Sequence, residues 1–311
     1  MTKFIVRRLL WTIPVLLLVI LLTFVLMRQI KGNPFQKSER AVTPAVQANL
    51  DRKFNLDKPA WQQYLLYTRG VLTFDLGPSL VSRNRDVNDI VREHFPRSIE
   101  LGLLATAFAV VIGIPLGVLA ALRQNSVFDY GAMFFSNVGH AAPNFLIATV
   151  LIYFFAVKWG DTFGLPTSGW ATWKHKVLPT IALGLVPMAY FARLIRGTML
   201  ETLQADYVRT ARAKGLRYRR VVGLQVMRNS LIPLVTTAGP LIGGLITGAF
   251  VVELIFSIPG IGRYYVTAVT ARDYSVVMGL TVLLSVIVIF ANLIVDVLYG
   301  FLDPRTRDAR A

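Results

Sequence analysis

The sequence predicts an all-α integral membrane protein with six transmembrane helices. Only 16% of its residues are charged and 54% are hydrophobic. A typical soluble domain has about 25% charged residues. The hydrophobic residues form separate blocks of about 20, which is the length that a helix needs to cross the hydrocarbon core of a bilayer. Six such blocks are present, so we expect six crossings.

The net charge of +16 has two interpretations. In a soluble protein it would suggest nucleic-acid binding. Here the basic residues lie mostly between and beside the apolar blocks. Membrane orientation and contacts with lipid headgroups therefore explain them better, and we expect no nucleic-acid partner. The chain contains no cysteine, which excludes disulfides and thiolate metal sites.

The spans can be placed in order along the chain. A short basic head, residues 1–8, precedes the first block, which lacks a following small-residue cleavage site and is expected to be retained. The second block follows a long polar segment, residues 28–97, whose aromatic residues favour local packing. Pro187 is expected to kink the fourth span. The six spans are predicted at Leu9–Met27, Ile99–Leu122, Met133–Val157, Val177–Leu194, Leu231–Val252 and Val276–Phe301.

Lys and Arg in the short loops predict the orientation. Six spans put both termini on one side, and that side carries three basic residues in the head, one after span two, nine between Arg193 and Arg228, and three in the tail. The opposite side carries three after span three and two after span five. By the positive-inside rule both termini are cytoplasmic, and the basic 28–97 segment is exempt because long loops translocate largely regardless of charge.

Motifs for catalysis are missing from the sequence. It has no phosphate-binding G-x-x-x-x-G-K-[ST] loop, no H-E-x-x-H and no G-x-S-x-G. His94, His140 and His175 lie far apart in sequence and have no metal-ligand spacing. We therefore expect no catalytic residue, no cofactor and no metal in this chain.

Two other classes stay open from the residues alone. A secondary transporter independent of an ATPase would need several buried acids, and the sequence places one, Asp296, inside a span. A membrane enzyme would need a catalytic cluster at one depth, and none is found.

Glycines four residues apart, at 113 and 117, 239 and 243, and 244 and 248, predict close helix packing within the bundle. In span five they are also compatible with contact to a second membrane subunit.

The segment Met199–Pro233 is the long polar stretch between two apolar blocks in the C-terminal part of the chain. A helix is predicted from apolar residues that recur at helical spacing, namely Leu200, Leu203, Tyr207 and Ala211. Gly215 is expected to end it in the left-handed conformation. A second short amphipathic helix should end near Pro233. Two patterned helices indicate a surface for a partner, and the alternative is a basic helix lying on anionic lipid.

Several motifs resemble those of one family. The sequences DYVRTARAKGL at 206–216 and RNSLIP at 228–233 are similar to the "EAA" loop of permeases of ATP-binding-cassette (ABC) importers, in the form of the dipeptide and oligopeptide subfamily. Seven further motifs also resemble those of that subfamily. They are FIVRRLL at 4–10, FNLDKP at 54–59, DLGPS at 75–79, FSIPGIG at 256–262, ARDY at 271–274, DVLY at 296–299 and LDPR at 302–305. The match covers nearly the full length of the chain. The long loop after span one resembles that of the first of the two permease subunits in such systems.

The resemblance implies a type I ABC-importer permease fold in the bacterial inner membrane. It divides the chain into a cytoplasmic head with the first span (1–30), an extracytoplasmic loop (31–97), a permease core (98–306) and a cytoplasmic tail (307–311). The implied partners are a second permease, two ATPase subunits that hold ATP and Mg, and an extracytoplasmic solute-binding protein. This chain would form half of the path for di- or oligopeptides. Nickel, glutathione and glycan-linked importers share the scaffold, so the substrate stays open.

Within this family the 199–233 segment would dock in a groove of a cytoplasmic ATPase. The implied coupling residues are Glu201, Asp206, Tyr207, Arg209, Thr210, Ala211, Arg212, Ala213, Lys214, Gly215 and Leu216. Where the broad family has Glu-Ala-Ala, this chain has Arg209-Thr210-Ala211, as the peptide subfamily commonly does, so the contact cannot rest on that Glu. We expect Ala211 and Ala213 to enter the groove while basic neighbours pair with acids on its rim.

The outer segments 28–97 and 253–275 would receive the binding protein, because of their size and aromatic content. The candidate outer gate consists of Phe256, Pro259, Gly260 and Gly262. Deleting part of 40–90 is expected to abolish uptake while assembly with the ATPase persists.

Overall fold

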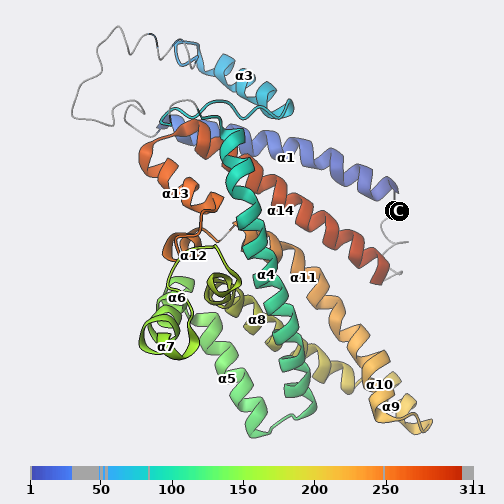
Figure 1. The fold of residues 1–311 in the computed structure, drawn as a ribbon. Coiled ribbons are helices and arrows are strands. Elements are labelled where there is room, and N and C mark those ends of the chain that lie inside the picture. Colours follow the sequence, from blue (N-terminus) through green and yellow to red (C-terminus); the bar gives the residue numbers. More distant parts are fainter. Residues whose placement is uncertain are drawn as a thin grey trace.

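The computed structural model describes residues 2–29, 49, 52, 55–82, 85–247 and 249–302, and in this part of the chain the regular elements are helices (Figure 1). The long helices are α1 (Thr2–Gln29), α4 (Val87–Leu122), α8 (Trp173–Leu203), α11 (Met227–Thr247) and α14 (Tyr274–Leu302). The shorter ones are α3 (Ala60–Leu72), α5 (Val127–Ala141), α6 (Asn144–Leu151), α7 (Gly160–Phe163), α9 (Asp206–Ala213), α10 (Tyr218–Val221), α12 (Phe250–Ile255) and α13 (Ile261–Ala271). Two π-helical segments, Ile152–Lys158 and Val222–Val226, complete the list.

Five of the helical segments are long and apolar enough to cross a membrane, and α5 with α6 adds a sixth crossing when the bent pair is counted as one span. The predicted spans one, four and six lie inside α1, α8 and α14. α8 runs unbroken through Pro179 and Pro187. The predicted all-helical membrane fold is thus confirmed. The tail 307–311 and most of 30–54 lie outside the described residues, so the expectations placed on them stay predictions.

The second span begins earlier than predicted. α4 starts at Val87 rather than near Ile99, because the side chains of Asp86 and Asp89 form a capping box at its first turn. The helix has 36 residues. At about 1.5 Å per residue it is far longer than the hydrocarbon core, which is about 30 Å thick. Its charged first turns therefore project beyond the core, and residues 87–97 of the expected outer loop are helical.

The third span is bent rather than straight. The axes of Val127–Ala141 and Asn144–Lys158 meet at 110°. Pro143 has no amide hydrogen, and Ala142 before it is extended, with ψ of 130°. α5 therefore ends at Ala141, and the single helix expected over Met133–Val157 is corrected to two.

The fifth span is also interrupted. α11 ends at Thr247 and α12 begins at Phe250, so the helix expected to continue to Val252 is divided. Ala249 has ψ of −5°, far from the helical value of about −42°. α12 and α13 then lead across the outer end of the bundle to α14.

Two of the three predicted glycine pairs allow close helix contacts. Of the third pair, Gly244 has no atom within 4 Å of an added Cβ, and Gly248 lies outside the described residues. A Cβ atom on Gly113 would lie 2.6 Å from the carbonyl oxygen of Met188, and one on Gly117 would collide with the carbonyl oxygen of Ala192. These contacts join α4 to α8. Gly239 and Gly243 face Val295 and Val288 and so join α11 to α14. Both sets show internal packing of this bundle.

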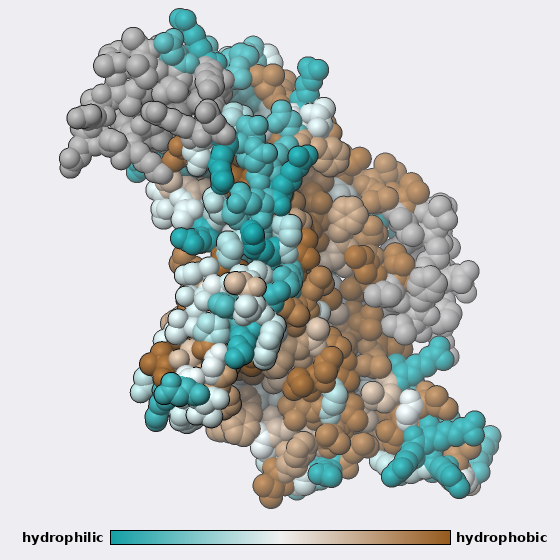
Figure 2. Space-filling view, viewed as in Figure 1, coloured by the Kyte–Doolittle hydropathy of each residue, from teal (hydrophilic) through white to brown (hydrophobic). Residues whose placement is uncertain are grey.

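The bundle has two chemically different ends. The first turn of α1, the last turn of α14 and the α9–α10 unit point toward one end, whereas α3 and α13 lie at the other (Figure 1). In Figure 2, apolar side chains cover the right-hand part of the surface between the two ends, whereas hydrophilic and intermediate residues run down its left-hand part. The candidate sites lie at the two ends.

Candidate functional site

The segment 199–233 forms a compact helical unit, but its helices differ from the prediction. The one helix expected through Leu203 and Tyr207 is broken, because Ala205 is extended with ψ of 146°. Its side chains therefore belong to α8 and α9 rather than to one stripe. The second helix does not end near Pro233 but continues as α11, since a proline removes only one backbone hydrogen bond and the buried Leu234 anchors the next turn.

α9 has one buried face. Val208 is fully buried and Ala211 is 6% exposed. Both lie in a hydrophobic cluster that includes Ile195 and Met199 of α8 and Val226. Ala211 is therefore corrected from a groove-entering residue to a packing residue, because it faces the interior of this chain and fixes the position of α9.

The opposite face of α9 is open to solvent. The predicted coupling residues that are exposed are Glu201, Asp206, Tyr207, Arg209, Thr210, Arg212, Ala213, Lys214, Gly215 and Leu216. Apart from the inward-facing Ala211, the predicted residues are thus presented together at one end of the bundle. Ala213 is a small residue among long basic side chains, so its position on this face is lower than the surrounding surface.

Gly215 ends α9 as predicted. Its φ is +79°, in the left-handed region that favours glycine. The amide of Leu216 donates to the carbonyl of Ala211 (3.3 Å), and the amide of Gly215 donates to that of Arg212 (2.9 Å). This pair of bonds is a Schellman motif. It fixes the direction in which the chain leaves α9.

Hydrogen bonds fasten the unit to α8 and α11. Asn229 Nδ2 donates to the hydroxyl of Tyr207 at 2.7 Å. Thr198 of α8 donates to the carbonyl of Ser230 at 3.1 Å, and the hydroxyl of Ser230 lies 3.3 Å from that of Thr202. Ser230 is fully buried. α9 is consequently held against the ends of two long helices, by the Asn229–Tyr207 bond and by the packing of its buried face.

The exposed face is strongly basic. It carries Arg209, Arg212 and Lys214, and Figure 2 shows a hydrophilic group of residues at the α9–α10 end. Arg209 pairs with Asp206 at 3.6 Å, but both side chains are exposed, so the pair contributes little to stability. The guanidinium of Arg212 lies 4.8 Å from the ring centre of Tyr218. The remaining positive charge is available to a partner with acidic residues.

The predicted outer-gate residues also come together, around a buried carboxylate. Glu253 is completely buried, and its Oε2 accepts from the amide of Gly262 at 2.8 Å. Beside it, Ser98 of α4 accepts from the amide of Ile261 at 2.9 Å. The first amides of α13 are therefore satisfied by two side chains. An added Cβ atom at Gly260 would overlap Glu253 and Ser98, and one at Gly262 would overlap Phe250 and Glu253, so larger residues would disturb this site.

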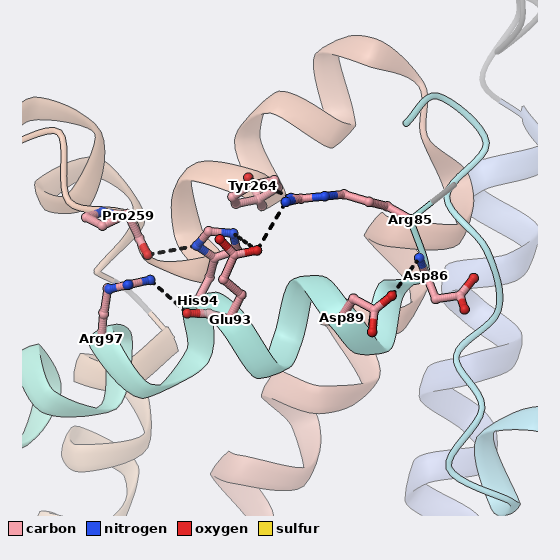
Figure 3. Close-up of polar contacts among 8 residues, drawn as sticks. All are labelled: Arg85, Asp86, Asp89, Glu93, His94, Arg97, Pro259 and Tyr264. Carbon is pink, nitrogen blue, oxygen red and sulfur yellow. Dashed lines mark hydrogen bonds and ion pairs between the residues drawn. The ribbon is translucent and has the colours of Figure 1, made fainter. Parts of the chain in front are cut away.

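A second set of contacts ties the outer loop to α4 (Figure 3). His94 Nδ1 donates to the carbonyl oxygen of Pro259 at 3.0 Å. Its ring stacks on Tyr264 with centroids 4.2 Å apart, and its Nε2 lies 3.5 Å from Glu93 Oε2. Arg85 donates to Glu93 at 3.2 Å. The remaining predicted gate residue, Phe256, is 1% exposed, and its carbonyl accepts from the amide of Gly169.

The two outer motifs that the sequence placed far apart also meet. Asp273 is 3% exposed and accepts from the hydroxyl of Ser79 and from the amides of Leu80 (3.1 Å) and Val81 (3.3 Å). The turn that follows α3, at residues 79–81, is thus bound to the start of α14.

Sequence reasoning missed two buried acids. Glu253 was placed just beyond the fifth span, although an acid inside the apolar run FVVELIF followed by two glycines was a usable signal. Asp129 is fully buried in α5 and receives two hydrogen bonds from Arg196 of α8, at 2.5 and 2.7 Å. Asp129 is paired with Arg196, and Glu253 accepts from the Gly262 amide through Oε2 while its Oε1 has no hydrogen-bond partner among the described residues. The described residues contain no group of three or more metal-ligating side chains.

Comparison with known proteins decides the family. Residues 113–308 match the family model described as the inner membrane component of binding-protein-dependent transport systems, and residues 1–102 match the N-terminal model of the same membrane component. The chain belongs to this family. It is therefore a multi-pass permease of the bacterial inner membrane that serves an ATP-driven importer, and a secondary transporter is not favoured.

Relatives match this permease over its full length. It is 45% identical over 308 residues to the dipeptide transport system permease protein DppB of Bacillus subtilis, covering 99% of this chain and 98% of the relative. It is 43% identical over 309 residues to the oligopeptide transport system permease protein OppB of Haemophilus influenzae, covering 99% and 100%. The inward-facing MetNI methionine ABC transporter shares the fold, with a TM-score of 0.54 and 16% identity over 69% of this permease and 96% of that chain.

Proposed function

We propose that this permease forms half of a path for di- or oligopeptides and that α9 docks on a cytoplasmic ATPase. The observation that carries the docking proposal is the construction of α9. Its buried face is held by α8 and α11, while three basic residues, Arg209, Arg212 and Lys214, lie on its exposed side. A helix held in this way transmits a displacement to two long helices without bending.

The proposed assembly contains a second permease, two ATPase subunits and an extracytoplasmic solute-binding protein. ATP and Mg would be held by the ATPases, and this chain would carry out no chemistry. ATP binding draws the ATPases together and displaces α9, which moves α8 and α11 as one body. The outer loop 256–262, tied to α4 through His94 and Ser98, would face the binding protein and gate the outer mouth.

Recovery of the ATPase with this chain tests the docking proposal. Ala213→Glu places a negative charge and a larger side chain at the centre of the exposed face. It should reduce the ATPase recovered with the permease at least tenfold, because it opposes an acidic rim. The matched control is Ala60→Glu, an exposed alanine at the start of α3. Equal recovery with both variants would refute docking through α9.

Peptide transport is tested by uptake. The relatives are named for dipeptide and oligopeptide transport, which supports peptides as the substrate class. The assembled importer in proteoliposomes, supplied with ATP and its binding protein, should accumulate a labelled dipeptide or pentapeptide. Unlabelled peptide should compete, whereas free amino acids should not. Competition by an amino acid and not by peptides would assign another substrate.

A further inference from the structure

A cavity of about 540 Å³ lies at the outer end of the bundle. Ligand-binding pockets in proteins are typically about 300–1,000 Å³. Its walls come from α1, α3, the turn after α3 and the start of α14, and they include Phe24, Arg28, Tyr67, Asp75 and Met278. None of its lining residues belongs to α9 or to the outer loop 256–262. It is a separate site.

The cavity lies at the depth of lipid headgroups. Its α1 wall consists of Phe24, Met27 and Arg28, where the apolar span of α1 ends. Its α14 wall includes Tyr274 and Ser275, where the apolar span of α14 begins. Deeper along α1, on the same side of the helix as Arg28, the side chains of Leu21 and Leu17 are exposed. An acyl chain below the cavity would meet this apolar surface.

α3 has the character of a helix that lies in the membrane interface. Trp61, Leu65 and Leu72 share one face of the helix and are 62%, 56% and 69% exposed. On its other side, the ring of Tyr64 contacts that of Phe24 with centroids 5.8 Å apart. The hydroxyl of Tyr64 donates to the carbonyl of Leu17 at 3.3 Å. α3 therefore lines the cavity with one face, which includes Gln63 and Tyr67, and leaves its apolar face exposed on the opposite side.

The polar groups in the wall match a molecule with both signs of charge. The guanidinium of Arg28 lies 5.6 Å from the centre of the Phe24 ring, which keeps it against the cavity wall. The Tyr67 hydroxyl is buried and has no hydrogen-bond partner among the described residues. Burial raises the pKa of the Tyr67 phenol, so it remains a protonated donor. Asp75 uses one carboxylate oxygen for the amide of Gly77, at 3.0 Å.

We propose that this cavity binds the headgroup of a zwitterionic phospholipid from the outer leaflet, with the phosphate at Arg28 and Tyr67 and the ammonium at Asp75. A free peptide is also a zwitterion and shares this chemistry. The apolar surface of α1 below the cavity and the exposed face of α3 favour the lipid, because a soluble peptide would not cover them. The bound lipid would brace α3 against α1 and α14.

Native mass spectrometry of the assembled importer tests this proposal. After delipidation, the complex is titrated with phosphatidylethanolamine, phosphatidylglycerol or dialanine, and bound molecules are counted. The wild type should retain one phosphatidylethanolamine per copy of this chain more tightly than phosphatidylglycerol. Arg28→Gln should weaken that binding about tenfold, which corresponds to 1.4 kcal/mol. Asp75→Asn should remove the preference for phosphatidylethanolamine over phosphatidylglycerol.

Tyr67→Phe guards against misfolding, because it keeps the ring and removes only the unpartnered hydroxyl. It should weaken lipid binding without lowering the thermal midpoint. The matched controls are Arg69→Gln and Asp57→Asn, which lie nearby, are exposed and do not line the cavity. Equal lipid binding by variants and controls would overturn the site. Binding of dialanine in place of lipid, or equal affinity of the wild type for both lipids, would overturn the assigned occupant.

Discussion

At residue 215 the backbone conformation favours glycine over any other residue. Gly215 has φ of +79° and open space around its Cα, so a substitution there meets backbone strain but no collision. Gly215→Ala should destabilise the end of α9 by about 1 kcal/mol, because an L-residue pays about 1–2 kcal/mol for the left-handed conformation. The thermal midpoint of the purified importer should fall, and so should the ATPase recovered with it.

Gly223 provides the control for that experiment. It also has no atom within 4 Å of an added Cβ, but its φ is not positive. Gly223→Ala should be neutral or stabilising, since alanine loses less backbone entropy than glycine on folding. Equal effects at both positions would mean that the left-handed turn does not matter.

Glu253 is the second residue with a specific prediction. Glu253→Ala removes the acceptor for the Gly262 amide inside a fully buried site. A buried donor left without a partner costs about 1–3 kcal/mol. Hydrogen exchange of residues 255–265 should therefore accelerate about tenfold, as measured by mass spectrometry. Glu253→Gln keeps a carbonyl oxygen and should restore part of the protection. Unchanged exchange in the alanine variant would show that Glu253 does not hold the outer loop.

The conformation of some of these residues could be predicted from the sequence, and that of others could not. The left-handed turn at Gly215 was predictable, because glycine at a helix end has a local signature. The inward position of Ala211 was not, since the break at Ala205 rotates α9 relative to α8 and no residue there signals it. The role of Glu253 in α12 depends on Ser98 of α4 and Gly262 of α13, and both of these residues lie on other helices.

Among the elements, the contact between α4 and α8 depends most on backbone proximity. A Cβ on Gly117 would collide with backbone atoms of Ala192, which cannot move aside as a side chain could. Gly117→Ala should push the two helices apart, and overpacking of this kind costs about 1–3 kcal/mol. The thermal midpoint of the purified importer should fall by several degrees. Gly131→Ala, where an added Cβ meets nothing within 4 Å, should leave it unchanged. If both variants unfold at the wild-type temperature, the close packing is not required.

The positions of helices could be predicted where an uninterrupted apolar block of about 20 residues forms the span. They were harder to predict where the backbone bends within such a block. The spans in α1, α8 and α14 followed from their apolar blocks. The bend after Ala141 did not, because a proline inside an apolar block is compatible with a kink or with a break. α8 continues as one helix through its two prolines, whereas Pro143 ends α5. Tertiary contacts make that choice, and a single sequence does not contain them explicitly.

In the whole molecule, α4 and α8 connect the two candidate sites. α8 is hydrogen-bonded to Ser230 of α11 through Thr198 and Thr202, and α11 is hydrogen-bonded to α9 through Asn229. α4 packs on α8 through Gly113 and Gly117, and at its outer end it holds the loop 256–262 through Ser98. Displacement of α9 would therefore reach the outer loop through contiguous packed helices. The distribution of charge predicted which end is which, and that assignment can be tested directly.

The natural absence of cysteine makes orientation measurable, because a single introduced thiol is the only one in the chain. Ala60→Cys and Ala213→Cys place exposed thiols at opposite ends of the bundle. If basic residues keep the α9 end in the cytoplasm, a membrane-impermeant maleimide should label Ala60→Cys in intact cells. It should label Ala213→Cys only after permeabilisation. The unmodified chain, which has no thiol, gives the background. Labelling of Ala213→Cys in intact cells would invert the orientation and would place α9 where no ATPase could reach it.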